Sequence, residues 1–255
     1  MNWNAFDISI LLPALLAGLL VASTHVPLGQ RVLQRGIIFL DLAVAQVAGL
    51  GIIFAYSLQW EPGSWQMQLV AFSAAFLGVL ILNYTEKHWP DIQEALIGTL
   101  FVLASSGSIL LLATNPHGGE QLKDILVGQI LWVSYEQLIP VFMLYVVILG
   151  IWFGFAKKLS SLHFYLLFAC AITASVQLVG VYLVFSTLIL PALVMRNIKK
   201  HTLLIGYFVA SLGYVLGLIF AALLDMPAGA MVVYSLAICA LVVVLTIHFL
   251  VARKI

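Results

Sequence analysis

The sequence is poor in charge. Its 11 basic and 10 acidic residues make only 21 charges in 255 residues, whereas 64% of the residues are hydrophobic. A soluble domain carries charge on about a quarter of its residues, so an ordinary soluble protein is excluded. The net charge of +1 gives no electrostatic basis for binding nucleic acid. Two cysteines, Cys170 and Cys239, lie alone in separate apolar runs and offer no disulfide framework.

Sequence motifs of catalysis are also missing. No GxxxxGK[ST] loop is present, so we expect that this chain does not bind and hydrolyse ATP by itself. The absence of HExxH, CxxC and GxSxG removes the common zinc-protease, redox and hydrolase signatures. We therefore expect no catalytic residues and no cofactor bound by this chain.

Long apolar runs dominate what is present. A helix needs about 20 apolar residues to cross a bilayer, and the runs predict an all-α, polytopic membrane bundle that interacts with lipid. We treat residues 1–255 as a single transmembrane domain. The expected spans are Ile8–Ser23, Ile37–Leu58, Gln66–Tyr84, Ala95–Thr114, Gln137–Phe155, the long block Phe164–Val194, Leu203–Leu224 and Ala228–Val251.

The long block decides between eight and nine spans. It is too long for one helix and too short for two full ones, and Gly180 is the expected corner of a hairpin. Cytoplasmic loops are enriched in Lys and Arg. With nine spans and the N-terminus outside, ten of the eleven basic residues share one side, and Lys123 is opposite. We therefore predict nine spans in the cytoplasmic membrane, with a cytoplasmic C-terminus.

Two shorter patterns concern helix ends. Residues 121–133 have a helical apolar period but are too few to cross, so we expect an interfacial helix on the outer face. Ser134 and Gln137 then form a capping box at the start of the fifth span. Asp91 and Glu94, three residues apart before the fourth span, are interpreted as helix-capping residues rather than as a catalytic pair.

Asp41 is the most informative candidate for a functional residue, because it is a carboxylate four residues inside the second expected span. A carboxylate at the centre of a membrane costs about 2.5–3.5 kcal/mol on insertion scales, and such residues usually face the bundle interior or a hydrated path. Ala45 and Ala48 share its helix face, which is narrow and permits close approach. Gln46 is about 140° round the helix from Asp41.

Two interpretations of Asp41 are open at this stage. It faces the bundle interior or a hydrated transport path, or it pairs with Arg31 or Arg35 at the cytoplasmic boundary. Gln177, just before the Gly180 corner, is a second candidate for the wall of a path, and Pro191 is expected to interrupt the following helix.

The outer loop of residues 115–124 holds a further candidate. His117, with Glu120 and Asp124, forms either an acidic and imidazole lip that meets an arriving cation or an ordinary solvated loop.

Read together, several stretches resemble the permease subunit of zinc, manganese and iron ABC importers. The likeness covers nearly the whole chain in order. Its pieces are GQRVLQRGIIFLDLAVAQVAGLG (29–51), EALIGTLFVLASSGSILLL (94–112), DILVGQILWVS (124–134), SVQLVGVYLVFSTLILPALVMR (175–196) and DMPAGAMVV (225–233).

The resemblance implies a type II ABC importer permease that moves zinc, manganese or iron. It implies a homodimer, a cytoplasmic ATPase that binds ATP, and an extracytoplasmic metal-binding protein. Asp41, Gln46 and Gln177 then line the substrate pathway, and Asp41 and His117 are the candidate contacts of the metal ion. The surface expected to face the ATPase consists of Lys157, Lys158, His163, Arg196, Lys199 and Lys200.

The sequence departs from this family in two places. The family often has a His about one turn after the Asp, where this chain has Ala45. The family's longer cytoplasmic segment, which docks the ATPase, is reduced here to residues 157–163. Two other classes remain as alternatives, a self-contained secondary transporter of a small solute and a structural membrane protein. The first would be supported by inverted repeats, but the two halves show no convincing similarity.

Overall fold

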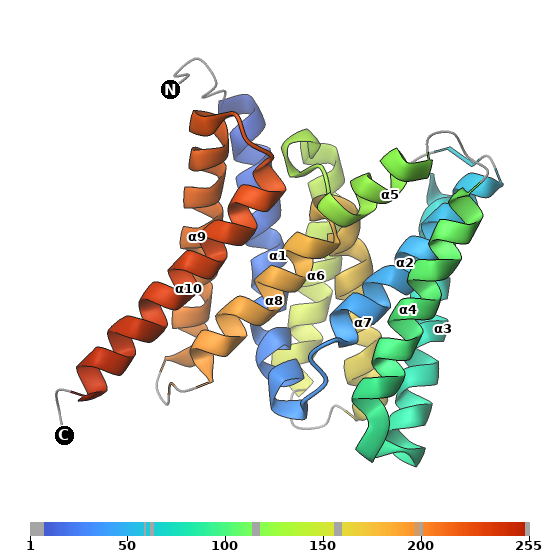
Figure 1. Cartoon of the computed structure of the whole chain (residues 1–255), viewed down its shortest axis with the longest axis horizontal. Coiled ribbons are helices and arrows are strands. Elements are labelled where there is room, and N and C mark those ends of the chain that lie inside the picture. Colours follow the sequence, from blue (N-terminus) through green and yellow to red (C-terminus); the bar gives the residue numbers. More distant parts are fainter. Residues whose placement is uncertain are drawn as a thin grey trace. The chain divides into compact units, whose positions relative to one another are not determined.

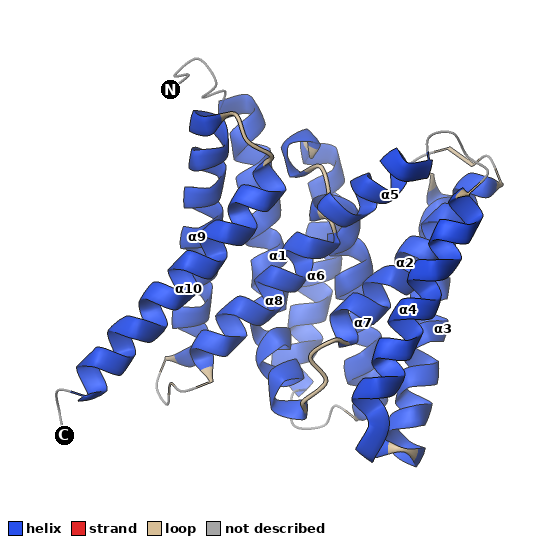
Figure 2. Ribbon diagram, viewed as in Figure 1, coloured by secondary structure: helices blue, strands red, loops and turns tan. Residues whose placement is uncertain are grey.

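The computed structural model describes residues 8–58, 60–61, 64–113, 118–155, 160–196, 198 and 201–252. Within these ranges all regular structure is helical, as predicted (Figure 2). The elements labelled in Figure 1, with two short 3-10 helices, are α1 (Ile8–Arg35), α2 (Leu40–Ser57), α3 (Trp65–His88), η2 (Pro90–Ile92), α4 (Gln93–Leu112), α5 (Gly118–Val127), η3 (Ile130–Trp132), α6 (Tyr135–Phe155), α7 (Ser161–Val179), α8 (Val181–Met195), α9 (Thr202–Leu224) and α10 (Ala228–Ala252).

Eight helices of the described ranges are long and apolar enough to cross a membrane. The ninth apolar helix, α8, has only 15 residues, which at 1.5 Å per residue is about 22 Å. The hydrocarbon core is about 30 Å thick, so α8 is too short to cross it completely. The predicted all-α membrane fold is therefore confirmed. Eight of the predicted spans reach full length, and the ninth corresponds to the shorter helix α8.

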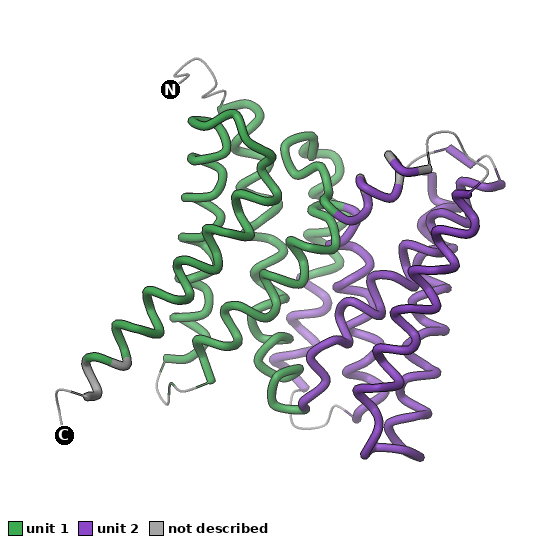
Figure 3. Tube along the Cα trace, viewed as in Figure 1, with its two compact units in different colours: residues 1–35, 127–145, 178–255 green, residues 36–126, 146–177 purple. Residues whose placement is uncertain are grey.

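Internal contacts divide the chain into two compact units, coloured separately in Figure 3. The first unit consists of residues 1–35, 127–145 and 178–255. The second unit consists of residues 36–126 and 146–177.

Glycines bring the helices of the first unit into close contact. α1 packs on α8 and α9, and α9 packs on α10. A Cβ atom added at Gly29 of α1 would overlap with the carbonyl oxygen of Leu188 in α8, and one added at Gly18 would overlap with the ring of Tyr214 in α9. The backbones of α1 and α8 therefore touch at Gly29.

The first helix is longer than expected. We predicted an end at Ser23, but α1 continues to Arg35 through Pro27. A proline inside a helix leaves the carbonyl four residues earlier without its N–H partner, and here that carbonyl belongs to Ser23. The hydroxyl of Tyr207 in α9 donates to it at 2.9 Å. This replacement donor explains why Pro27 does not end the helix.

Helix α8 is also uninterrupted, contrary to the prediction for Pro191, which lies inside it. Thr187 ties α8 to α9. Its hydroxyl donates to the carbonyl of Leu183 at 2.7 Å and accepts from the hydroxyl of Tyr214, with 2.8 Å between the two oxygens. These bonds satisfy buried polar groups of both helices.

Two glycines with positive φ meet in the first unit. Gly180, at φ +83, separates α7 from α8 as predicted, and Gly128, at φ +71, ends α5. A Cβ atom on either glycine would overlap with the backbone next to the other. The predicted helix over residues 121–133 is therefore broken into α5 and η3.

The predicted capping box at the start of α6 is present. Gln137 accepts from the backbone N–H of Ser134 at 3.0 Å, and the Ser134 hydroxyl accepts from the backbone N–H of Gln137 at 3.4 Å.

In the second unit, α2 packs on α3 and α4. Small residues bring α2 and α3 together, because a Cβ atom on Gly51 would lie 3.0 Å from the carbonyl oxygen of Val70. One turn earlier, Val47 of α2 approaches Gly78 of α3. These contacts leave α2 buried along most of its length.

Candidate functional site

Asp41 lies in the first turn of α2, where its side chain is completely buried. Neither carboxyl oxygen has a hydrogen-bond partner among the described residues. We predicted a position four residues inside the helix, but Asp41 is the second residue of α2. The cause is a turn at positive φ at Gly36, followed by a bond from the N–H of Leu40 to the carbonyl of Ile37 at 3.1 Å.

The neighbours of Asp41 along α2 are buried as well. Ala45 and Ala48, which share its helix face, are 0% and 1% exposed, and Gln46 is 4% exposed. Inside a membrane a buried ionisable group is expensive, so it persists where it has a partner or a function. The two arginines considered as partners, Arg31 and Arg35, belong to the first unit.

Glu94 caps the helix that carries Asp41. One of its carboxyl oxygens accepts from the backbone N–H of Phe39, the N-cap residue of α2, at 3.1 Å. The capping role predicted for the Asp91 and Glu94 pair is therefore found at Glu94. The helix that it caps is α2, 55 residues away, rather than its own helix. The other Glu94 oxygen is buried and has no hydrogen-bond partner among the described residues.

Gln93, beside Glu94, joins three helices. The Thr85 hydroxyl of α3 donates to its side-chain oxygen at 2.9 Å. Its side-chain amide donates to the Leu82 carbonyl of α3 at 2.9 Å and to the Tyr165 hydroxyl of α7 at 3.4 Å. The glutamine is 4% exposed, so these are buried bonds that hold the start of α4 against α3 and α7.

Gln177, the second predicted pathway residue, lies in the last turn of α7 and is exposed. Its side-chain oxygen accepts from the side-chain amide of Gln68 in α3 at 2.5 Å. The bond joins the end of α7 to the start of α3.

Two more buried oxygens of the second unit have no hydrogen-bond partner in the part of the chain that the structure describes. They belong to Asn83 of α3 and Thr173 of α7, which are 7% and 0% exposed. Inside a protein an unpaired polar group costs free energy, whereas a passing ion or water can bind to it.

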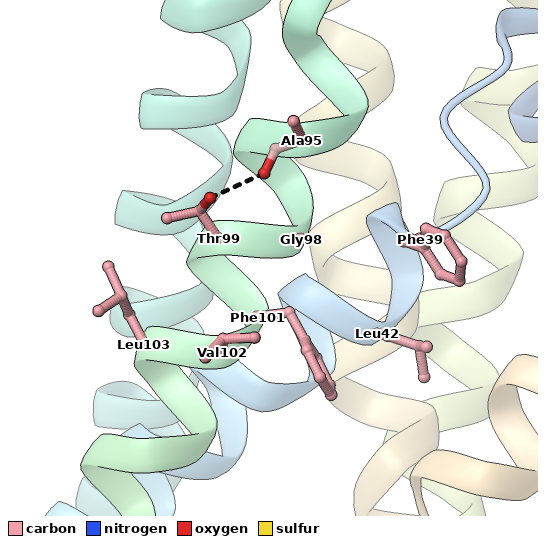
Figure 4. A pocket seen from close by; sticks show the side chains of 8 residues that line it. All are labelled: Phe39, Leu42, Ala95, Gly98, Thr99, Phe101, Val102 and Leu103. Atoms are coloured by element: carbon pink, nitrogen blue, oxygen red, sulfur yellow. Dashed lines mark hydrogen bonds between the residues drawn. The ribbon is translucent and has the colours of Figure 1, made fainter.

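A groove of about 580 Å³ lies on the second unit beside the start of α2 (Figure 4). Its only polar side chain is that of Thr99, whose hydroxyl already donates to the Ala95 carbonyl at 2.8 Å. The groove is lined by Phe39, Leu42, Ala95, Gly98, Thr99, Phe101, Val102 and Leu103. It suits an apolar occupant and supplies no ligands to a metal ion.

The residues predicted to face an ATPase are described only in part. His163, near the start of α7, is exposed and has its Nδ1 2.6 Å from the Ser160 hydroxyl. Arg196, exposed at the end of α8, is the C-cap residue of that helix. The remaining residues predicted to face the ATPase lie outside the described residues; they are Lys157, Lys158, Lys199 and Lys200. The candidate metal ligand His117 also lies outside the described residues.

No group of three or more His, Cys, Asp or Glu side chains in the described ranges could hold a metal ion. Among the described residues, Asp41 is thus not part of a cluster of such ligands.

The model of the ABC 3 transport family matches residues 7–165 and 154–247. The chain belongs to the ABC 3 transport family. It is a multi-pass membrane subunit of a metal-type ABC importer and has no catalytic activity by itself. The resemblance found in the sequence is therefore confirmed.

Curated relatives agree with this assignment. The chain is 25% identical over 251 residues to a "probable metal transport system membrane protein" of Chlamydia trachomatis serovar D, covering 88% of this chain and 84% of the relative. It is 25% identical over 255 residues to a protein of the same description from Chlamydia muridarum, covering 90% and 86%.

Solved structures support the fold. PsaBC from Streptococcus pneumoniae, in complex with Fab, aligns with a TM-score of 0.69 and 20% identity, covering 92% of this chain and 89% of that chain. An inward-facing metal-chelate type ABC transporter aligns with a TM-score of 0.64 and 17% identity, covering 96% and 86%.

Sequence reasoning missed three features of the site. The partner of Glu94 and the three-helix role of Gln93 both depend on contacts between helices, which sequence spacing does not reveal. Asn83 could have been found from the sequence, since it is an amide that directly follows the apolar run of residues 74–82 in α3.

Proposed function

We propose that this chain imports a divalent transition metal ion, zinc, manganese or iron, across the cytoplasmic membrane. A separate ABC ATPase supplies the energy, and an extracytoplasmic metal-binding protein delivers the ion. The permease acts as a homodimer in which each chain is a single transmembrane domain. Its N-terminus is outside and its C-terminus is cytoplasmic.

The observation that carries this proposal is the carboxyl group of Asp41. It is completely buried on an apolar helix, and both of its oxygens lack a hydrogen-bond partner among the described residues. Carboxylate oxygens bind divalent cations, manganese among them. In a membrane, an unpaired carboxylate is an expected part of an ion pathway. Asp41 is therefore the proposed contact of the metal ion.

Other side chains take supporting roles. Gln46 and Gln177 line the pathway with amide groups, and His117 meets the ion at the outer loop. A polar amide solvates a moving ion without holding it, which favours release at the far side.

The proposed ATPase-facing surface consists of basic and imidazole side chains. Two of these residues, His163 and Arg196, are exposed and so are accessible to a partner protein. The rest of the surface consists of Lys157, Lys158, Lys199 and Lys200.

Three observations support a metal ion as the transported substrate. The chain belongs to the ABC 3 transport family. Its curated relatives are described as metal transport proteins, and one structural neighbour is a metal-chelate type transporter. Zinc, manganese and iron are distinguished by the experiment below.

The test is uptake into vesicles that contain the permease together with its ATPase. Radioactive Zn²⁺, Mn²⁺ and Fe²⁺ are offered in separate assays, with ATP inside the compartment that the ATPase faces. We expect uptake of at least one metal only when both ATP and ATPase are present, because this chain has no nucleotide-binding loop. The matched control carries an ATPase with its phosphate-binding lysine replaced. Uptake that survives in this control would show a self-contained transporter and overturn the proposal.

A further inference from the structure

Helix α2 begins without a cap of its own. Its N-cap residue is Phe39, whose side chain makes no capping hydrogen bond. In a capping box, a Glu or Gln at the third helical position accepts from the N–H of the N-cap residue. In α2 that position is occupied by Leu42, whose side chain has no hydrogen-bond acceptor. The helix that carries Asp41 therefore depends on an acceptor from elsewhere.

Glu94 of α4 supplies this acceptor. Its carboxyl oxygen is 3.1 Å from the backbone nitrogen of Phe39, two residues before Asp41. A negative charge at a helix N-terminus also interacts favourably with the helix dipole. Figure 4 shows that the neighbouring residue Ala95 and the start of α2 at Phe39 lie on adjacent helices.

The position of Glu94 is itself fixed. The preceding residue, Gln93, is buried and bonded to Thr85 and Leu82 of α3 and to Tyr165 of α7. Ile97, one turn further along α4, is completely buried. The backbone on both sides of Glu94 is therefore anchored, which keeps its carboxyl group within reach of the start of α2.

We propose that Glu94 is the positioning residue for Asp41: it holds the N-terminus of α2 so that the Asp41 carboxyl is presented to the ion. Partners that orient a metal-binding side chain typically change metal affinity by about 10–100-fold when they are removed. The proposal rests on the proposed function of Asp41.

The second oxygen of Glu94, which is buried and has no partner within the described ranges, points to the alternative role that the experiment must separate. In that role the carboxylate would bind the ion directly and its charge would be essential. Glu94→Gln separates the two roles, because the amide oxygen can still accept from the Phe39 N–H although the charge is gone.

The experiment measures ATP-driven uptake of Zn²⁺, Mn²⁺ and Fe²⁺ by the complete complex in vesicles, and binding of the same ions to the detergent-solubilised complex without ATP. Glu94→Ala is expected to raise KM and the dissociation constant about tenfold, with less than a twofold change in kcat. Glu94→Gln is expected to stay within about twofold of wild type in both measurements. Asp91→Ala removes an exposed carboxylate three residues away and serves as the control with wild-type values.

A second variant removes the other partner of the bond. Phe39→Pro deletes the donor N–H, and the φ of −83 at Phe39 is close to the proline value of about −65. Phe39→Pro is expected to raise KM as much as Glu94→Ala does. The double variant with both substitutions is expected to raise KM by less than a further twofold. If Glu94→Ala does not fold, Phe39→Pro and Glu94→Gln decide the outcome.

Three results would overturn the proposal: wild-type KM in Glu94→Ala, wild-type KM in Phe39→Pro, or a loss in Glu94→Gln equal to that in Glu94→Ala. The role of Asp41 itself is tested independently by Asp41→Asn. Full uptake in that variant would contradict the proposed function whatever the Glu94 variants do. Loss of uptake in Asp41→Asn together with wild-type behaviour of Glu94→Ala would contradict only the positioning role.

Discussion

The two units of the molecule treat their buried polar groups differently. In the first unit, Tyr207 donates to the carbonyl that Pro27 leaves free, and Thr187 and Tyr214 bond to each other. In the second unit, five buried side-chain oxygens have no hydrogen-bond partner within the described ranges. They are both carboxyl oxygens of Asp41 and one oxygen each of Asn83, Glu94 and Thr173.

We interpret this difference as a division between structural support in the first unit and transport in the second. A satisfied buried bond contributes about 1 kcal/mol to stability, whereas an unpaired buried oxygen costs about 1–3 kcal/mol. A membrane protein retains such an oxygen where an ion or water uses it. The first unit is therefore interpreted as the packed scaffold, and the second as the part that meets the ion.

The largest effect is expected where backbones touch in the first unit. Gly29→Ala would place a Cβ atom on the Leu188 carbonyl oxygen, and neither backbone can move aside without disturbing α1 or α8. We expect a loss of about 3 kcal/mol of stability, because overpacking a tight contact typically costs 1–3 kcal/mol. This loss is measured by heating the detergent-solubilised protein to a series of temperatures and determining the fraction that remains folded by size-exclusion chromatography.

The matched control for Gly29→Ala is Gly150→Ala. Gly150 lies on an exposed part of α6 in the second unit, and an added Cβ atom meets nothing within 4 Å. Its melting temperature is expected to equal or slightly exceed that of wild type, since Ala favours a helix over Gly. Equal melting temperatures for both variants would show that the contact between α1 and α8 is not tight.

A pair of threonines tests the comparison directly. Thr187→Val removes the bond to Tyr214 in the first unit and is expected to cost about 1 kcal/mol or more, because the tyrosine hydroxyl loses a partner. Thermal unfolding of the purified protein gives the change in stability.

Thr173→Val is the corresponding change in the second unit, and it is expected to have the smallest effect. Its hydroxyl has no partner to lose among the residues that the structure describes, so stability should stay the same or rise by up to about 1 kcal/mol. A destabilisation as large as that of Thr187→Val would remove the distinction between the two units.

Much of the fold was predictable because it depends on local patterns. Apolar runs located the membrane helices, Gly180 marked the break between α7 and α8, and the Ser134 and Gln137 spacing predicted a capping box that the structure contains. Each of these signals involves residues that are close in sequence, where spacing determines the contact.

The errors arose where a distant residue supplies a missing partner. The first helix was expected to end at Ser23, but it continues to Arg35, because Tyr207 of another helix satisfies the carbonyl that Pro27 leaves free. Glu94 was expected to cap a helix and does so, but the helix is α2 and the donor is Phe39. Sequence spacing contains no information about such pairs, so the immediate surroundings of Asp41 required the structure.

The most direct measurement compares wild type with Asp41→Asn in vesicles that contain the complete complex. Uptake of Zn²⁺, Mn²⁺ and Fe²⁺ is measured, and the melting temperature is determined on the same preparation. The variant keeps the shape of the side chain and removes its charge. We predict that uptake falls at least about tenfold, while the melting temperature is unchanged or higher because an unpaired buried carboxylate has been removed. Wild-type uptake by Asp41→Asn, or loss of uptake accompanied by loss of the folded protein, would contradict a role of Asp41 in contacting the ion.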